Sequence, residues 1–272
     1  GAEIAVKALR EPDIYLGSKP LLVGDLDCIT DAVSIAATNT AMNVVDRPDQ
    51  GEYRLGTIDA IDLDNVAPGE IAYGRVSGKA GKAAFQYVER CIKLALAGEV
   101  DAVATAPINK EALNLGGHHY SGHTEIFADF TDTKDYCMML ADGSFRVSHV
   151  TTHVSLRDAC DLVTAERVGM VIGLTHNALI RMGVSQPKIG VAGLNPHAGE
   201  GGMFGTEEIE AIEPAIREAQ ARGINAEGPV SPDTLFAKAL AGQYDAAVAM
   251  YHDQGHIPMK TSSFKLDAAT GR

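Results

Sequence analysis

The sequence predicts an α/β protein whose strands form parallel sheets. Short apolar runs, such as residues 188–193 and 246–250, have the length of strands and no polar face, which is typical of strands buried on both sides of a parallel sheet. Longer amphipathic segments alternate with these runs, and Gly98 separates one of them from the apolar residues 100–106. This order of helix, glycine and strand indicates βαβ construction.

The composition narrows the class of protein. The chain has 272 residues, 46% of them hydrophobic, so it can bury a large core in one or two domains. Its net charge of −13 argues against a non-specific nucleic-acid surface. The four cysteines are widely spaced without a CxxC pair, and we interpret them as buried thiols in a reducing compartment. Because no apolar run has the length of a membrane span and no signal-peptide core is present, we expect a soluble cytoplasmic protein.

The spacing of apolar residues and the positions of Gly and Pro predict the order of elements. We expect strands at residues 19–25, 60–63, 100–106, 145–151, 188–193 and 246–250. Helical periodicity predicts helices at residues 1–11, 31–39, 77–97, 111–115, 126–130, 156–182, 207–222 and 234–240. Residues 228–233, with the sequence GPVSPD, predict a turn.

The segment from Asp245 to Lys260 changes abruptly from apolar to polar. Its apolar strand is followed directly by a polar stretch that contains His252 and Asp253, and Pro258 argues against a simple continuation. Ligands of open α/β sheets bind just beyond the carboxyl ends of strands. A His-Asp pair at that position can supply a metal ligand and an acid or base, and the alternative is a capped turn whose histidine is merely hydrogen-bonded.

Three histidines share this context. His153, His197 and His252 each lie in a polar segment just past an apolar strand. Neutral imidazole suits zinc, cobalt or a similar divalent ion, and three ligands leave a position open for substrate. Each histidine taken singly also fits a hydrogen-bonded loop residue, and whether one chain or two supply the three is left open. Asp233 and Asp253, near the same edge, can orient a histidine, bind metal or transfer protons.

A second group of residues suits an anion. His123 and Thr124 lie in a Gly-His-Thr-Glu segment at the start of an expected helix, where free N–H groups favour negative charge. The alternative is an ordinary capping box with Ser121 as the N-cap. Lys110 lies at a strand-to-helix turn and suits a phosphate, or it is simply solvated. The glycines of residues 199–205 lack the GxGxxG spacing, so we expect no Rossmann fingerprint.

Several of these segments together resemble a known family, the 4-hydroxythreonine-4-phosphate dehydrogenases of pyridoxal phosphate biosynthesis. The matching blocks are TAPINKEAL (105–113), SGHTE (121–125), THVSL (152–156), GLNPHAGEGG (193–202), PDT with Phe236 (232–236) and AMYHDQGHIPMK (249–260). The resemblance covers nearly the whole chain. The phrase YHDQGHIP is closer to the branch that acts on 4-phospho-D-threonate and D-erythronate 4-phosphate than to the vitamin B6 enzymes.

The resemblance implies a fold and a chemistry. It implies a two-domain, three-layer α/β/α fold like that of isocitrate and isopropylmalate dehydrogenases, in a homodimer. The reaction it implies is NAD-dependent oxidation of the 3-hydroxyl of a 4-phosphorylated hydroxy acid, followed by decarboxylation. A divalent metal, commonly zinc with magnesium or cobalt as alternatives, would be held by residues matching His153, His197 and His252, with both subunits contributing. We expect neither nucleic acid nor membrane as a partner.

The resemblance also assigns the remaining site residues. The substrate-binding His-Thr pair of the family matches His123 and Thr124, and its substrate lysine matches Lys260. Lys260 would hold the phosphate and belong to the catalytic group, in which Asp253 or Asp233 would assist proton transfer. A metal chelated by hydroxyl and carboxylate would acidify the alcohol and stabilise the enolate formed on decarboxylation.

The expected domains are residues 1–117 with 261–272, and residues 118–260. After Lys260 the family continues through a segment that binds substrate, whereas here TSSFKLDAATGR follows directly and resembles the far side of that segment. Two other functions fit part of the pattern. A zinc hydrolase or lyase would use the three histidines with Asp253 as base, and a non-catalytic homologue would bind a sugar phosphate only.

Overall fold

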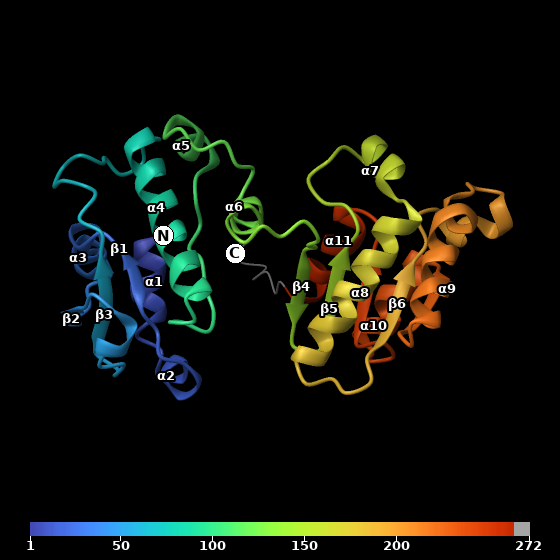
Figure 1. Cartoon of the computed structure of the whole chain (residues 1–272), viewed down its shortest axis with the longest axis horizontal. Coiled ribbons are helices and arrows are strands. Elements are labelled where there is room, and N and C mark those ends of the chain that lie inside the picture. Colours follow the sequence, from blue (N-terminus) through green and yellow to red (C-terminus); the bar gives the residue numbers. More distant parts are fainter. Residues whose placement is uncertain (264–272) are drawn as a thin grey trace, which may run out of the picture. The chain divides into compact units, whose positions relative to one another are not determined.

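The chain folds into two compact units. A computed structural model describes residues 1–263, and the units are Gly1–Lys134 and the chain from Asp135 onward (Figure 1). This boundary differs from the expected one between residues 117 and 118, because Ile126 is fully buried in a core that contains Phe85 and Val88. Residues 118–134 therefore belong with the first unit. Residues 261–263 continue a helix of the second unit, and the expected placement of residues 264–272 lies outside the described part.

The first unit contains a small parallel sheet. Its strands are β1 (Leu22–Gly24), β3 (Thr57–Asp62) and β2 (Ala41–Val44), in that spatial order. Its helices are α1 (Ala2–Ala8), α2 (Pro12–Gly17), α3 (Leu26–Ile35), η1 (Pro48–Gln50), α4 (Gly78–Leu96), α5 (Lys110–Leu115) and α6 (His123–Phe130). The central strand β3 is buried along most of its length, so its apolar residues form the contact between the flanking layers.

Two buried aspartates tie down the loops of the first unit. Asp59 accepts hydrogen bonds from the backbone N–H groups of Glu52 and Tyr53 and from the amide of Asn43. Asp25 caps α3 at Cys28 and also accepts from the backbone of Val66. Because a carboxylate buried without donors would be costly, these bonds fix both loops against the sheet.

The second unit is a five-stranded sheet with helices on both faces. The strands are β4 (Met139–Asp142), β5 (Phe145–His149), β8 (Ala246–Ala249), β6 (Lys188–Ala192) and β7 (Asn225–Val230), in that order, with only β4 antiparallel to its neighbour. The helical segments are α7 (Leu156–Leu162), α8 (Ala165–Arg181), η2 (Pro196–Gly202), η3 (Glu208–Ile212), α9 (Glu213–Ala221), α10 (Pro232–Leu240) and α11 (His252–Ser263).

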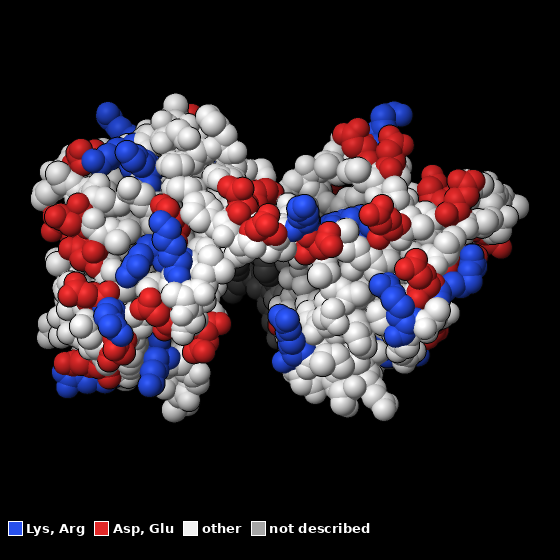
Figure 2. Space-filling view, viewed as in Figure 1, with Lys and Arg blue, Asp and Glu red and all other residues white. Residues whose placement is uncertain are grey.

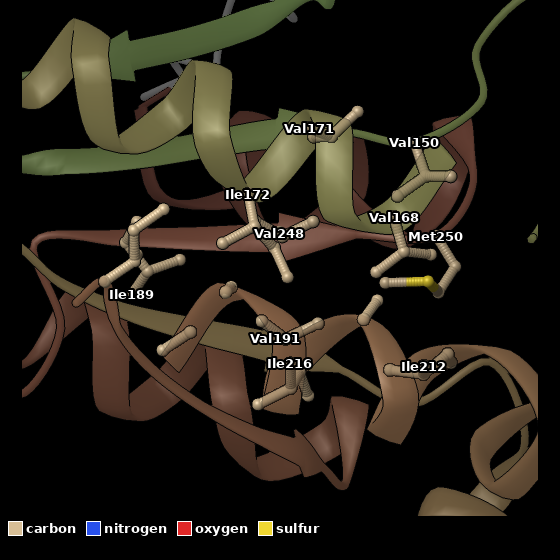
Figure 3. Close-up of a cluster of buried hydrophobic side chains, with 14 of the residues drawn as sticks. Val150, Val168, Val171, Ile172, Ile189, Val191, Ile212, Ile216, Val248 and Met250 are labelled. Atoms are coloured by element: carbon tan, nitrogen blue, oxygen red, sulfur yellow. The ribbon is translucent and has the colours of Figure 1, made fainter. Parts of the chain in front are cut away.

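The central strand β8 divides the core of this unit in two. Ala246 and Val248 join the larger cluster, with residues of α8 and α9 (Figure 3). Ala247 and Ala249 join the other cluster, with residues of α10 and α11. Because side chains alternate along a strand, one fully apolar run fills both layers. The expected three-layer α/β/α class is confirmed in this unit.

Several expected boundaries were wrong. Residues 100–106 form no strand and are mostly exposed, and the sheet of this unit ends at β1 and β2. The expected helix 156–182 is broken at Thr164, whose side chain accepts from the N–H of Arg167 and starts α8. Residues 228–230 belong to the edge strand β7 rather than to a turn, and an edge strand tolerates Pro229.

The polar stretch after β8 is a helix, not the expected loop. Helix α11 begins at His252 and runs through Pro258 to Ser263. Proline removes a backbone donor and normally ends or kinks a helix. Here four residues on the inner face, Gln254, Gly255, His256 and Met259, are buried, so packing holds the helix together. Among the described helices, none is long and apolar enough to cross a membrane.

A histidine is buried beneath this helix. His149 at the end of β5 has no exposed surface, and its Nδ1 lies 3.3 Å from the carbonyl oxygen of Met138. Its Nε2 has no hydrogen-bond partner within residues 1–263. Burial lowers the pKa of His149 to about 4, against the opposing effect of the Met138 carbonyl. The core therefore holds a neutral imidazole.

This buried imidazole predicts a loss of stability in acid. Because the pKa of His149 is lower in the folded state, the unfolded chain binds the proton first, and stability falls as pH drops from 7 toward 4. His149 should account for a loss of about 2 kcal/mol in the free energy of unfolding between pH 7 and pH 5, measured by urea unfolding. His149→Phe, which cannot titrate, should flatten the pH dependence by that amount whatever its stability at pH 7. An identical pH dependence in both proteins would contradict the assignment.

Candidate functional site

The ends of β5 and β8 form a pocket of about 310 Å³. These strands are parallel neighbours, so the segments that follow them lie side by side. The lining residues are Thr152, His153, Val154, Leu156, Ala159, Tyr251, His252 and Asp253. Two of the three histidines expected to bind metal thus line one pocket, with one of the two expected acidic residues.

His153 and His252 approach each other across this pocket. Their ring centroids are 5.9 Å apart and the rings are tilted by 44°. His252 lies in the first turn of α11, and His153 lies in the loop between β5 and α7. His153 is exposed and His252 is half-buried, so a ligand can reach both imidazoles.

His252 is held by two neighbours. Its Nδ1 is 2.7 Å from Oδ1 of Asp253, and the carboxylate can only accept, so Nδ1 carries the proton and Nε2 keeps a lone pair. The ring of His256 stacks on His252, with centroids 3.7 Å apart at 12°. The Nδ1 of His256 bonds the His252 carbonyl oxygen at 2.9 Å. Asp253 therefore sets the tautomer, and His256 fixes the plane of the ring.

His256 is a residue of this site that the sequence analysis did not single out. Burial lowers the pKa of His256, although its bond to the His252 carbonyl raises it, and the net lowering favours a neutral ring. The signal in the sequence was that His252 and His256 are four positions apart, which places them on the same face of a helix. It was missed because residues 252–263 were not expected to be helical.

His197 follows the third of three adjacent strands but lies apart from the other two histidines. It belongs to η2, after β6, and it is exposed, with its ring 6.3 Å from that of Phe204. Within residues 1–263, no group of three His, Cys, Asp or Glu side chains is placed to hold a metal ion. One described chain thus brings His153 and His252 together without His197, and a site completed by a second subunit stays a prediction.

Asp233 lies near His197 rather than in the pocket. Its Oδ1 accepts from the hydroxyl of Ser231 at 2.6 Å and from that of Thr234 at 3.2 Å. The hydrogen bond from Ser231 is the largest cause of the lowered pKa of Asp233, and His197 adds to it. The carboxylate is therefore charged at neutral pH.

The expected substrate residues His123 and Thr124 belong to the first unit. His123 is the first residue of α6, and Gly122 is the N-cap, so the alternative with Ser121 as the capping side chain was wrong. The ring is half-buried, and burial lowers the pKa of His123. Its Nε2 has no partner among the described residues. A substrate-binding role for this pair stays a prediction.

The two lysines considered for anions are both exposed. Lys110 is the first residue of α5, where Asn109 supplies the cap by accepting from the N–H of Ala112. Lys260 lies in the last turns of α11, the helix that starts with His252.

On the face shown in Figure 2, acidic side chains gather around α7 with basic ones among them. An anionic substrate would need a local cation, and Lys260 is on the same helix as the pocket histidine.

A buried amide joins two of the strand ends. The Oε1 of Gln254 accepts from the N–H of Met250 at 2.7 Å, and its Nε2 donates to the carbonyl oxygen of Gly193 at 2.8 Å. Gln254 is 8% exposed, so both bonds are shielded from water. The amide links the start of α11 to the end of β6, from which the His197 loop departs.

These features define the class of protein. A pocket at the carboxyl ends of parallel strands, lined by imidazoles and a carboxylate, is typical of an enzyme that acts on a small polar molecule. The comparisons with known proteins agree. The model of a family described as "Pyridoxal phosphate biosynthetic protein PdxA" matches residues 17–269. The chain therefore belongs to the PdxA family, and it is an oxidoreductase.

Several relatives are similar over almost the whole chain. A Clostridium botulinum protein provisionally named D-threonate 4-phosphate dehydrogenase is 49% identical over 269 residues, which are 99% of this chain and 80% of that protein. The crystal structure of a 4-hydroxythreonine-4-phosphate dehydrogenase from Klebsiella pneumoniae is 42% identical with a TM-score of 0.90, and covers 97% of this chain and 80% of its own. One from Burkholderia phymatum is 42% identical with a TM-score of 0.88 and the same coverage. The family resemblance expected from the sequence is confirmed.

The close packing of α11 on β5 predicts that Gly255 cannot be replaced by a larger residue without a loss of stability. A Cβ atom at Gly255 would lie 2.4 Å from Nε2 of His149 and 2.8 Å from Cγ1 of Val147. We expect Gly255→Ala to lower the free energy of unfolding by about 1–3 kcal/mol, because α11 must shift. Gly173→Ala is the matched control, since nothing lies within 4 Å of a Cβ there, in α8. It should raise stability by about 0.5–1 kcal/mol. Equal effects of the two changes in urea unfolding would refute the close contact.

Proposed function

We propose that the chain is a dehydrogenase of a 4-phosphorylated hydroxy acid, dependent on NAD and a divalent metal. It would oxidise the 3-hydroxyl of the substrate, and the resulting 3-keto acid would lose carbon dioxide. The relatives named above support the substrate class, because both of their names specify a phosphorylated hydroxy acid. The observation that carries the proposal is the pocket of His153, His252 and Asp253 in a chain of this family.

The identities favour one branch of the family. The relative named for D-threonate 4-phosphate is 49% identical, whereas the structures named for 4-hydroxythreonine 4-phosphate are 42% identical. We therefore propose 4-phospho-D-threonate, or its close analogue D-erythronate 4-phosphate, as the preferred substrate. The phrase YHDQGHIP at residues 251–258, which includes His256, supports the same branch.

The donor set fits a borderline divalent ion such as zinc. His252 has a free Nε2 lone pair and an Asp253 carboxylate behind it, which is the arrangement common to metal-binding histidines. We propose that His153 and His252 of one subunit and His197 of the other hold the ion, with a homodimer as the active form. When bound, the ion would supply Lewis acidity at the hydroxyl and carboxylate oxygens of the substrate.

The remaining residues would bind the substrate and handle protons. Asp233, which is charged at neutral pH, is the proposed acceptor of the proton of the 3-hydroxyl. Asp253 would keep His252 in the binding tautomer or take part in proton transfer. We propose that Lys260 binds the phosphate, because an exposed ammonium attracts an anion. The start of α6, with His123 and Thr124, would bind substrate in its own right, because free helix N–H groups attract negative charge.

NADH formation tests the reaction. The protein should reduce NAD in the presence of zinc or another divalent ion, followed by the near-ultraviolet absorbance of NADH. We expect 4-phospho-D-threonate and D-erythronate 4-phosphate to be used more efficiently than 4-phosphohydroxy-L-threonine. Release of carbon dioxide in proportion to NADH would establish the second step. A preference for 4-phosphohydroxy-L-threonine would move the chain to the other branch, and silence with all three substrates would refute the activity.

Alanine substitutions test the metal ligands. Loss of His153, His197 or His252 should each weaken zinc binding by roughly 100-fold or more, because even changes behind a ligand cost about 10- to 100-fold. His119→Ala, at an exposed histidine of the first unit, is the control and should leave zinc binding unchanged. Zinc content and calorimetric titration give the measurement.

Mixed subunits test whether two chains share the site. Neither His197→Ala nor His252→Ala should bind zinc tightly alone. When the two variants are unfolded and refolded together, the mixed dimers should regain one complete site, with His153 and His252 from one chain and His197 from the other. Failure of the mixture to recover any tight zinc binding would contradict a shared site.

A further inference from the structure

A carboxylate buried next to the His197 loop has no part in the proposed chemistry. Glu208 is 2% exposed and begins η3, a π-helical turn. Turns of this type are rare and often occur at functional sites. Within residues 1–263 it makes no ion pair, so hydrogen bonds alone compensate its burial.

All of those hydrogen bonds go to the residues that start the loop. Oε1 accepts from the backbone N–H groups of Leu194 and Asn195, each at 2.7 Å. Oε2 accepts from Nδ2 of Asn195 at 3.0 Å. The carboxylate of Glu208 thus accepts three hydrogen bonds from Leu194 and Asn195, just before His197.

The loop itself has an unfavourable backbone. Six consecutive residues, 197–202, have positive φ, and the three that are not glycine are His197 (φ 52°), Ala198 (φ 52°) and Glu200 (φ 44°). Side chains of L-residues disfavour this left-handed region, which is usually visited by single residues. A run of this kind persists only where the surrounding structure determines it.

Two glycines let the carboxylate reach this run. A Cβ atom at Gly199 would lie 2.7 Å from Oε2 of Glu208, and one at Gly193 would lie 3.0 Å from Oε1. Glu208 therefore lies close to Gly193, before the turn that carries His197, and to Gly199, within that turn. The left-handed turn and the carboxylate make one structural unit.

We propose that Glu208 is a positioning residue that holds the His197 loop in its left-handed form and so sets the metal affinity of the site. The part that concerns metal rests on the proposed function, in which His197 is a ligand. The part that concerns the loop stands on the hydrogen bonds alone. A side chain that touches neither metal nor substrate would thus control how well His197 is presented.

Glu208→Gln tests the proposal in the full-length protein. The amide keeps the volume of the side chain but places an N–H₂ group against Nδ2 of Asn195, so donor faces donor. Hydrogen exchange of residues 194–205 in the metal-free protein should become at least about tenfold faster, while the strands keep their protection. Zinc affinity should fall roughly 10- to 100-fold. Glu210→Gln, the same change at an exposed position two residues on, should alter neither.

The two readouts separate the possible failures. Unchanged loop exchange in Glu208→Gln would overturn the positioning role, and faster exchange with unchanged zinc affinity would overturn its effect on the metal. Absence of zinc binding in the unsubstituted protein would instead refute the proposed metal site. Gly199→Ala provides a second route if Glu208→Gln folds poorly, because it separates the loop from an intact carboxylate and should give the same two changes.

Discussion

The burial of β8 on both faces is the constraint on which the second unit depends. All four of its residues are 0% exposed, so each must meet another apolar layer. A polar side chain along this strand would be buried on either face, and the first exposed positions come after its carboxyl end. His252 and Asp253 occupy these positions. The neighbouring strand β5 ends at the same edge and delivers His153 to the same pocket.

The parts of this architecture that follow from local pattern could be predicted from the sequence. Residues 188–193 and 246–250 are continuous apolar runs, and both are central strands. The placement of His153, His197 and His252 just after strands could also be expected, because each follows a segment with the pattern of a strand. The pairing of His153 with His252 needed the strand order, which no local pattern contains.

The parts that depend on distant contacts could not be predicted. Pro258 argued against a simple continuation after β8, and the helix α11 was not expected there. Burial of this helix against β5 outweighs the hydrogen bond that Pro258 removes, and His256 was missed as a consequence. Residues 228–230 contain Gly and Pro yet form an edge strand, since only one side of β7 needs donors. The left-handed turn at His197 depends on Glu208, which approaches it only in the folded chain.

The amide of Gln254 links the segment that leads to His197 with the segment that leads to His252. It joins the N–H of Met250, before His252, to the carbonyl of Gly193, before the His197 loop. If either segment moves away, a buried donor or acceptor on the other is left unpaired, at a cost of about 1–3 kcal/mol. The two bonds of Gln254 therefore oppose separate movement of the end of β6 and the start of α11. Flexibility in one segment would therefore be transmitted to the other, although Gly193 and Gln254 are 61 positions apart in the sequence.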